Sequence, residues 1–142
     1  MPAKRTVLII IAVLVVGFIV LQVVPGFAKT NPPVTYQVKW DSPKTESRMR
    51  RACYDCHSNE TVWPWYSNIA PISWLLVHDV DEGRGKMNFS NGSHLDARDM
   101  IRQIQNGSMP KSIYLPLHPD ANLSDTEKAD LIAGITATFR GG

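Results

Sequence analysis

The stretch Cys53-Tyr54-Asp55-Cys56-His57 decides the fold of this 142-residue chain and contains its only two cysteines. The spacing C-x-x-C-H is typical of a site where haem is attached covalently. Two thiols add across the vinyl groups of the porphyrin, and the adjacent imidazole becomes the proximal ligand of the iron. With no further cysteine in the sequence, the motif predicts one covalent haem c per chain.

Three other roles for the cysteine pair fit the sequence less well. A thiol-disulfide oxidoreductase places C-x-x-C at a helix start within a strand-helix-strand pattern, and no such pattern surrounds Cys53. A structural zinc site usually takes two separated pairs of ligands, and no second Cys or His pair of that spacing follows. A structural disulfide leaves His57 without a role.

An apolar segment, residues 7–24, precedes the motif and is interrupted only by Gly17 and Gln22. Eighteen residues in a helix extend about 27 Å, close to the thickness of a bilayer core. Lys4 and Arg5 come just before the segment, so the positive-inside rule predicts a cytoplasmic amino terminus. We therefore expect a single-pass protein of the bacterial cytoplasmic membrane, with its haem on the periplasmic or extracellular side.

A cleaved signal peptide is the alternative role for this segment. Gly26-Phe27-Ala28 resembles a cleavage site and would release a chain that begins at Lys29. The apolar core of a signal peptide usually ends at about 15 residues, so we favour a retained anchor in residues 1–28 and a haem domain in residues 29–142. Both alternatives export the haem domain, and bacteria attach c-type haem outside the cytoplasm.

The exported part is balanced in charge. Lys4 and Arg5 belong to the anchor, so residues 29–142 carry 13 basic and 13 acidic side chains. No basic stripe indicates a nucleic-acid-binding protein. The length of the exported part suits one small domain, and the haem would form much of its core.

Hydrophobic periodicity predicts an all-α, cytochrome c-like domain around the haem, preceded by one transmembrane helix. Ser124 and Glu127 match the capping box of the last helix. Residues 30–41 alternate apolar and polar, which indicates an extended tether that buries its aromatic side chains. Residues 58–71, rich in aromatics and proline, are not expected to form regular structure. The predicted helices of the domain are 44–52, 72–82, 95–105 and 124–139.

Met109 is the first choice for the distal ligand of the iron. It lies in a loop between the third and last predicted helices, where its thioether would close the iron and raise the haem potential. His78 is the second choice and His118 a further alternative, whereas His94 is expected to be an exposed loop residue. A purely packing role for Met109 is also open.

Arg51 and Arg84 are candidates for binding the haem propionates, because a guanidinium holds a carboxylate with two hydrogen bonds. The alternatives are a solvated position for Arg51 and a side chain that lies along the protein surface for Arg84.

The chain resembles the bacterial haem-binding domain family of single-haem c-type proteins over residues 31–138. It departs from the family pattern at Asn91-Gly92, since a tryptophan commonly follows Asn-Phe-Ser in the family. The resemblance implies haem binding and a helical, cytochrome-like fold. The shared segments are Asn31-Pro32-Pro33-Val34, Cys53-Tyr54-Asp55-Cys56-His57-Ser58-Asn59-Glu60-Thr61, Trp63-Pro64-Trp65-Tyr66, Ile69-Ala70-Pro71, Gly83-Arg84, Asn88-Phe89-Ser90, Met109-Pro110 and Leu123-Ser124.

These observations favour a membrane-anchored monohaem cytochrome c that passes electrons to redox partner proteins in the periplasm or membrane. No set of residues indicates substrate chemistry, so we expect an electron carrier rather than an enzyme. The alternative is a haem-based sensor, or a small-ligand-binding or peroxidatic protein, with an open or displaceable distal site. A haem-bearing module that docks on a membrane oxidase or reductase is compatible with the first function.

Overall fold

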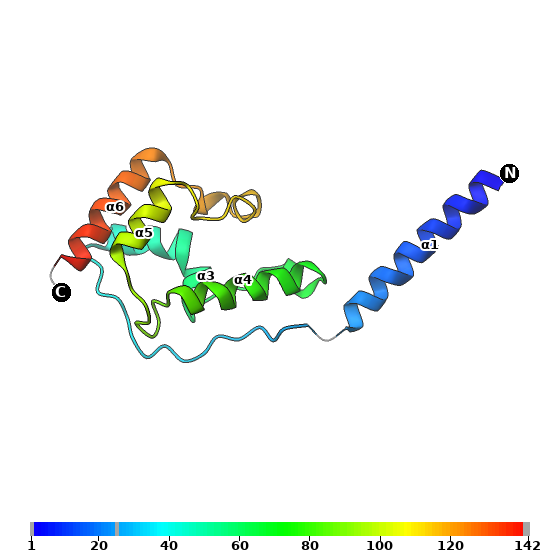
Figure 1. Cartoon of the computed structure of the whole chain (residues 1–142), viewed down its shortest axis with the longest axis horizontal. Coiled ribbons are helices and arrows are strands. Elements are labelled where there is room, and N and C mark those ends of the chain that lie inside the picture. The colour runs from blue at the N-terminus through cyan, green and yellow to red at the C-terminus, as the bar shows by residue number, and fades with distance from the viewer. Residues whose placement is uncertain (1, 25, 141–142) are drawn as a thin grey trace. The chain divides into compact units, whose positions relative to one another are not determined.

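The computed structural model describes residues 2–24 and 26–140. Residue 1, where the predicted anchor begins, and residue 142, where the predicted haem domain ends, lie outside the described residues. Its regular structure is helical, and the described residues contain no strand beyond one isolated bridge between Asn88 and Ser93. The all-α prediction is confirmed (Figure 1). The helices are α1 (Pro2–Val23), α2 (Pro43–Met49), α3 (Asp55–His57), α4 (Ile72–Lys86), α5 (Ala97–Gln105) and α6 (Asp125–Phe139). The short helical turns are η1 (Arg50–Tyr54), η2 (Trp65–Asn68), η3 (Leu115–Leu117) and η4 (Pro119–Ala121).

The chain forms two compact units. Unit 1 consists of Met1–Lys29 and Pro64–His78, and unit 2 of Thr30–Trp63 and Asp79–Gly142. Unit 2 therefore contains the C-x-x-C-H motif, whereas the aromatic segment that follows it belongs with the amino-terminal helix.

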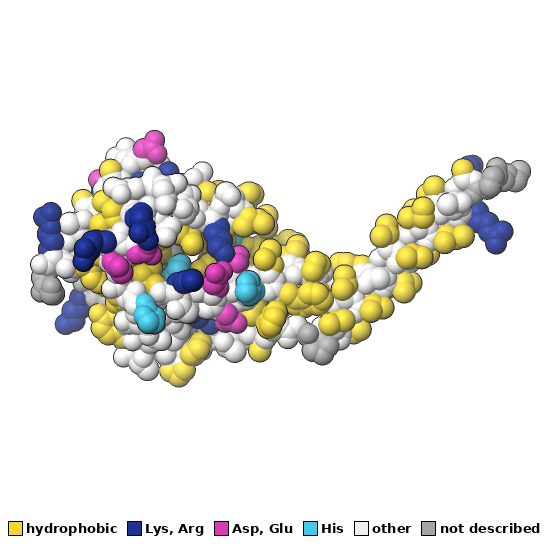
Figure 2. Space-filling view, in the orientation of Figure 1, with side chains coloured by type: hydrophobic (Ala, Val, Ile, Leu, Met, Phe, Trp, Pro, Cys, Tyr) yellow, Lys and Arg dark blue, Asp and Glu magenta, His cyan; other side chains and the backbone are white. Residues whose placement is uncertain are grey.

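Helix α1 is long and apolar enough to cross a membrane. Within Ala3–Val23, an 18-residue stretch has a mean hydropathy of 3.0. Figure 2 shows apolar side chains along this helix and basic side chains at its amino-terminal end. The predicted apolar helix is therefore present.

The helical backbone of unit 2 runs without a break from α2 through η1 to α3. Met49 and Tyr54, which join these elements, both have right-handed helical angles (φ −61°, ψ −44° and φ −63°, ψ −33°). η1 is a π-helical turn, a rare feature that often occurs at functional sites. The helix ends at His57, because the backbone of Ser58 is extended (φ −142°, ψ 171°). The predicted helix 44–52 therefore continues five residues beyond its expected end and carries the whole motif.

Three details of the sequence-based prediction need correction. Helix α4 does not stop at Glu82 but continues through Gly83 and Gly85 to Lys86. Helix α5 begins at Ala97 rather than Leu95, because the Asp96 side chain accepts hydrogen bonds from the first free backbone amides. The aromatic stretch, expected to be irregular, contains the 3₁₀ turn η2.

The core of unit 2 surrounds the motif-bearing helix, and α2 and α5 both pack on α6 (Figure 1). Trp40, from the extended segment, donates a hydrogen bond to the Tyr54 hydroxyl (3.1 Å) and contacts Phe89 edge-on. Tyr36 is 44% exposed, so the tether buries only part of its aromatic surface. The buried cluster comprises Met49, Tyr54, Phe89, Met100, Ile104, Leu123, Leu131 and Ile135.

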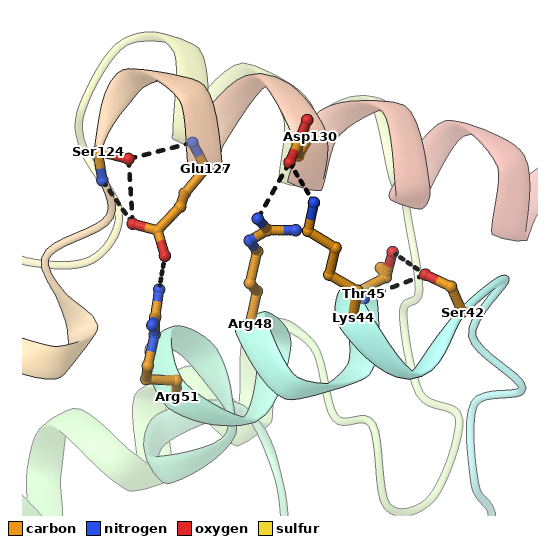
Figure 3. Close-up of polar contacts among 8 residues, drawn as sticks. All are labelled: Ser42, Lys44, Thr45, Arg48, Arg51, Ser124, Glu127 and Asp130. Carbon is orange, nitrogen blue, oxygen red and sulfur yellow. Dashed lines mark hydrogen bonds and ion pairs between the residues drawn. The ribbon is translucent and has the colours of Figure 1, made fainter.

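Charged pairs join the motif-bearing helix to α6 (Figure 3). Asp130 accepts hydrogen bonds from Lys44 (2.8 Å) and Arg48 (3.0 Å). Arg51 pairs with Glu127, which also forms the predicted capping box with Ser124. The guanidinium of Arg51 therefore binds a carboxylate of the protein, and its pairing with a haem propionate stays a prediction.

Acid should weaken this contact between helices. The hydrogen bond from Arg51 lowers the pKa of Glu127 from 4.5 to about 2. A carboxylate with a lowered folded-state pKa stabilises the fold above its unfolded pKa and loses that contribution as the pH falls through the folded pKa. We expect Glu127→Gln to lower the melting temperature at neutral pH, and the difference from the wild type to disappear between pH 4.5 and about 2.

Asp125→Asn is the matched control, because Asp125 lies in the same first turn with a fully exposed side chain 3.6 Å from Lys128. Melting curves followed by circular dichroism, on the full chain in detergent, measure both variants. A deficit of Glu127→Gln that stayed constant with pH would contradict the assignment.

Candidate haem site

The two cysteines lie three residues apart on the helical stretch that ends at His57, so both face the same side of that helix. Both are unpaired and partly buried. Burial raises the pKa of the Cys53 thiol to about 12 and that of Cys56 to about 11. Redox-active C-x-x-C pairs have a lowered thiol pKa, so this environment does not fit an oxidoreductase.

The residues around the motif also do not form a metal site of their own. Among residues 2–24 and 26–140, no three His, Cys, Asp or Glu side chains converge on one point. A porphyrin supplies four nitrogen ligands to its iron, so the protein needs to provide only axial ligands. One imidazole beside two thiols therefore fits haem better than a bare zinc ion.

The orientation of the His57 ring is set by the segment that follows α4. His57 Nδ1 lies 3.2 Å from the Met87 carbonyl oxygen, which can only accept, so Nδ1 carries the hydrogen. The lone pair is then on Nε2, the atom that the prediction assigns to iron, as in metal sites where the second ring nitrogen is hydrogen-bonded. Burial lowers the pKa of His57, although the carbonyls of Met87 and Gly83 oppose the shift. The ring is therefore neutral at pH 7.

The backbone of His57 is held by the same segment, because its carbonyl accepts a hydrogen bond from the Phe89 amide (2.8 Å). The Phe89 ring lies 6.2 Å from the imidazole and stacks on Tyr54 at 5.0 Å. Residues 87–89 thus hold both the main chain and the side chain of the predicted proximal ligand.

Helix α4 approaches Cys56 so closely that only glycine fits at position 83. A β-carbon built on Gly83 would lie 2.5 Å from the Cys56 carbonyl oxygen and 3.2 Å from its β-carbon. This contact explains why a helix tolerates the glycine that we expected to end it.

A buried polar network connects the residues after the motif to the Asn88-Phe89-Ser90 segment. Asn88 donates to the side chain of Asn59 (2.8 Å), whose backbone amide donates to the Ser90 hydroxyl (2.9 Å). Asn59 also donates to the Pro33 carbonyl (3.0 Å). Segments from three parts of the sequence therefore meet directly behind His57.

Arg84 also contacts the residues after the motif. Its guanidinium donates to the carbonyls of Ser58 (2.7 Å) and Thr30 (2.8 Å), the Asn31 amide oxygen (2.9 Å) and the Thr61 hydroxyl (2.9 Å). These four contacts occupy the guanidinium within the protein, and its pairing with a haem propionate stays a prediction.

The loop that carries Met109 lies beside the motif. Lys111 forms an ion pair with Asp79 (2.7 Å). Burial raises the pKa of Cys56 and lowers that of His57, and the charge of Lys111 opposes the first shift and adds to the second. Tyr114, further along the loop, donates a hydrogen bond to Asp55 within the motif (2.7 Å). Met109 itself is half-buried, and its ligation of the iron stays a prediction.

The three other histidines occupy different environments. His118 stacks on Tyr114 with ring centroids 3.7 Å apart and donates through Nδ1 to the Tyr114 carbonyl (3.1 Å). His78 is exposed and belongs to unit 1, and His94 is an exposed loop residue, as expected. The roles of Asp55, Lys111 and Tyr114 were missed, although the position of Asp55 inside the motif could have indicated one of them.

The contact between Gly83 and Cys56 generates a test with an internal control. Gly83→Ala should lower the free energy of unfolding by about 1–3 kcal/mol and reduce haem content, because the new methyl meets backbone that cannot move aside. Gly85→Ala, two residues along α4, has open space around it and should be neutral or stabilise the protein by about 0.5–1 kcal/mol. Equal stability of the two variants, measured with the full chain in detergent, would rule out this close approach.

Comparison with known proteins agrees with this geometry. The model of the haem-binding domain family matches residues 16–137, which is most of the chain and includes the motif, the polar network and the Met109 loop. No curated protein and no solved structure matches the chain. The family match shows that the protein binds haem, and this chain belongs to the haem-binding domain family.

Proposed function

We propose that this protein is a membrane-anchored monohaem c-type cytochrome that transfers electrons on the outer side of the bacterial cytoplasmic membrane. The orientation of His57 carries the proposal: its Nδ1 donates to Met87, so Nε2 binds iron, beside two unpaired thiols on the same helix. Helix α1 anchors the protein through residues 7–24, and residues 29–142 are exported.

Cys53 and Cys56 attach the haem covalently. Each S–H adds across one vinyl double bond, with sulfur bonding to one carbon and hydrogen to the other, so the reaction needs no oxidant and releases no leaving group. The two unpaired thiols on one side of a helix support this role.

Met109 is the distal ligand in this proposal. Its loop is tied to unit 2 by Lys111, which pairs with Asp79, and by Tyr114, which donates to Asp55 in the motif. When bound, the haem supplies an iron that gains and loses one electron. With Met109 and His57 both as ligands, the haem would be closed to other ligands and would have a raised potential, which suits exchange with redox partner proteins in the periplasm or membrane.

Removal of the thiols tests covalent attachment. Wild-type protein, matured with a c-type haem assembly system, should retain haem after denaturation in detergent, whereas Cys53→Ala/Cys56→Ala should release it, because no thioether can form. Haem-stained denaturing gels measure the difference. Haem retained by the double variant would contradict attachment at these residues.

Absorption spectra test the distal ligand. The ferric wild type should show a low-spin spectrum with a sulfur-to-iron band, and the ferrous form should not bind carbon monoxide promptly. Met109→Leu should lose the band and bind carbon monoxide, since leucine has a similar volume but no ligand atom. Met100→Leu, in the buried core cluster, is the matched control and should keep the wild-type spectrum.

Two outcomes would change the proposal. A low-spin spectrum without the sulfur-to-iron band in both the wild type and Met109→Leu would remove Met109 as ligand and leave His118 or His78. Prompt carbon monoxide binding by the wild type would show an open iron and favour a haem-based sensor or a peroxidatic protein over an electron carrier.

A further inference from the structure

The carboxyl-terminal end of helix α1 is hydrogen-bonded to the segment Pro64–His78 of unit 1. The Gln22 side chain donates to the Ala70 carbonyl (3.1 Å) and accepts from the Ala70 amide (3.0 Å). The amide thus pairs with both backbone groups of one residue, a two-bond contact between positions 48 residues apart. Gln22 is the polar interruption in an otherwise apolar span, and this contact gives it a structural role.

Further contacts hold the same segment to the chain that follows α1. Lys29 donates hydrogen bonds to the Ser67 hydroxyl (3.3 Å) and to the Asn68 side chain. Gly26 lies against the indole of Trp74, where a β-carbon would come within 2.6 Å of the ring. The segment is therefore attached both to the end of the apolar helix and to the residues after it.

The chemistry of this segment differs from that of the remaining exported chain. Residues 64–78 contain no Asp, Glu, Lys or Arg, although about one in four of the other exported residues is charged. Large apolar side chains are exposed on it: Trp65 is 75%, Ile72 49% and Leu75 50% exposed. Phe27, also in unit 1, is 65% exposed.

The length of α1 indicates where this apolar surface lies. Its 22 residues extend about 33 Å, against a hydrocarbon thickness of about 30 Å. Lys4 and Arg5 mark one boundary of the membrane, so Gln22, in the last turn, lies at the other. Ala70, which pairs with Gln22, lies at that boundary as well.

We infer that residues 64–75 form a membrane-interface segment, in which Trp65, Ile72 and Leu75 enter the headgroup and upper acyl region of the bilayer that α1 spans. This inference rests on the retained anchor of the proposed function. Tryptophan is enriched at this depth, and a stretch without charges loses no ion hydration on entering it. The occupant of the exposed apolar surface is thus lipid.

The test uses the full haem-loaded chain in phosphatidylcholine vesicles that contain a phosphatidylcholine with a photoactivatable diazirine on its acyl chain. After illumination, mass spectrometry maps the lipid adducts on peptides. We expect adducts on α1 and on residues 64–75 of the wild type. Ile72→Glu/Leu75→Glu should reduce the adducts on residues 64–75 about tenfold, because carboxylates avoid the apolar region, and leave those on α1 unchanged.

Ile113→Glu/Leu117→Glu is the matched control, since these apolar side chains are similarly exposed (68% and 62%) but belong to unit 2. It should keep the wild-type adducts on residues 64–75. The haem spectrum shows that each variant is folded. Adducts on α1 alone would overturn the inference and leave the retained anchor intact. A mature chain that begins at Lys29 and carries no adducts would contradict both the inference and the retained anchor.

Discussion

The hydrogen bonds between His57 and residues 87–89 are the interaction on which the rest of unit 2 depends. The Met87 carbonyl selects the ring nitrogen that carries hydrogen, and the Phe89 amide fixes the main chain of the same residue. Both contacts require α4 to approach the motif closely, and Gly83 against Cys56 makes that approach possible. The two contacts thus fix the orientation of the His57 imidazole, the predicted proximal ligand.

The polar residues of the family signature serve this arrangement rather than chemistry of their own. Asn59 and Asn88 pair with each other in a buried position, and Arg84 gathers carbonyl groups from two distant segments. Buried polar groups are costly unless they are paired, and every buried side-chain polar atom of the described residues has a partner. Such a network specifies one arrangement of the chain behind the haem motif.

The aromatic segment after the motif contacts a different part of the chain from the one that its position suggests. Residues 64–78 group with α1 in unit 1, where Gln22 and Lys29 bind them. Large apolar side chains are exposed on this segment, as they are along α1. These contacts join residues far apart in the sequence into one unit around the carboxyl-terminal end of α1.

The sequence by itself determined the cofactor class, the all-helical content and the apolar amino-terminal helix, because each depends on residues close together in the chain. Cys53, Cys56 and His57 are such a local signal, and so is the capping box of Ser124 and Glu127. Only the tertiary structure decided the partners of Arg84 and the continuation of helix α4 beyond Gly83 and Gly85. These features depend on contacts between residues far apart in sequence, which neither periodicity nor spacing encodes.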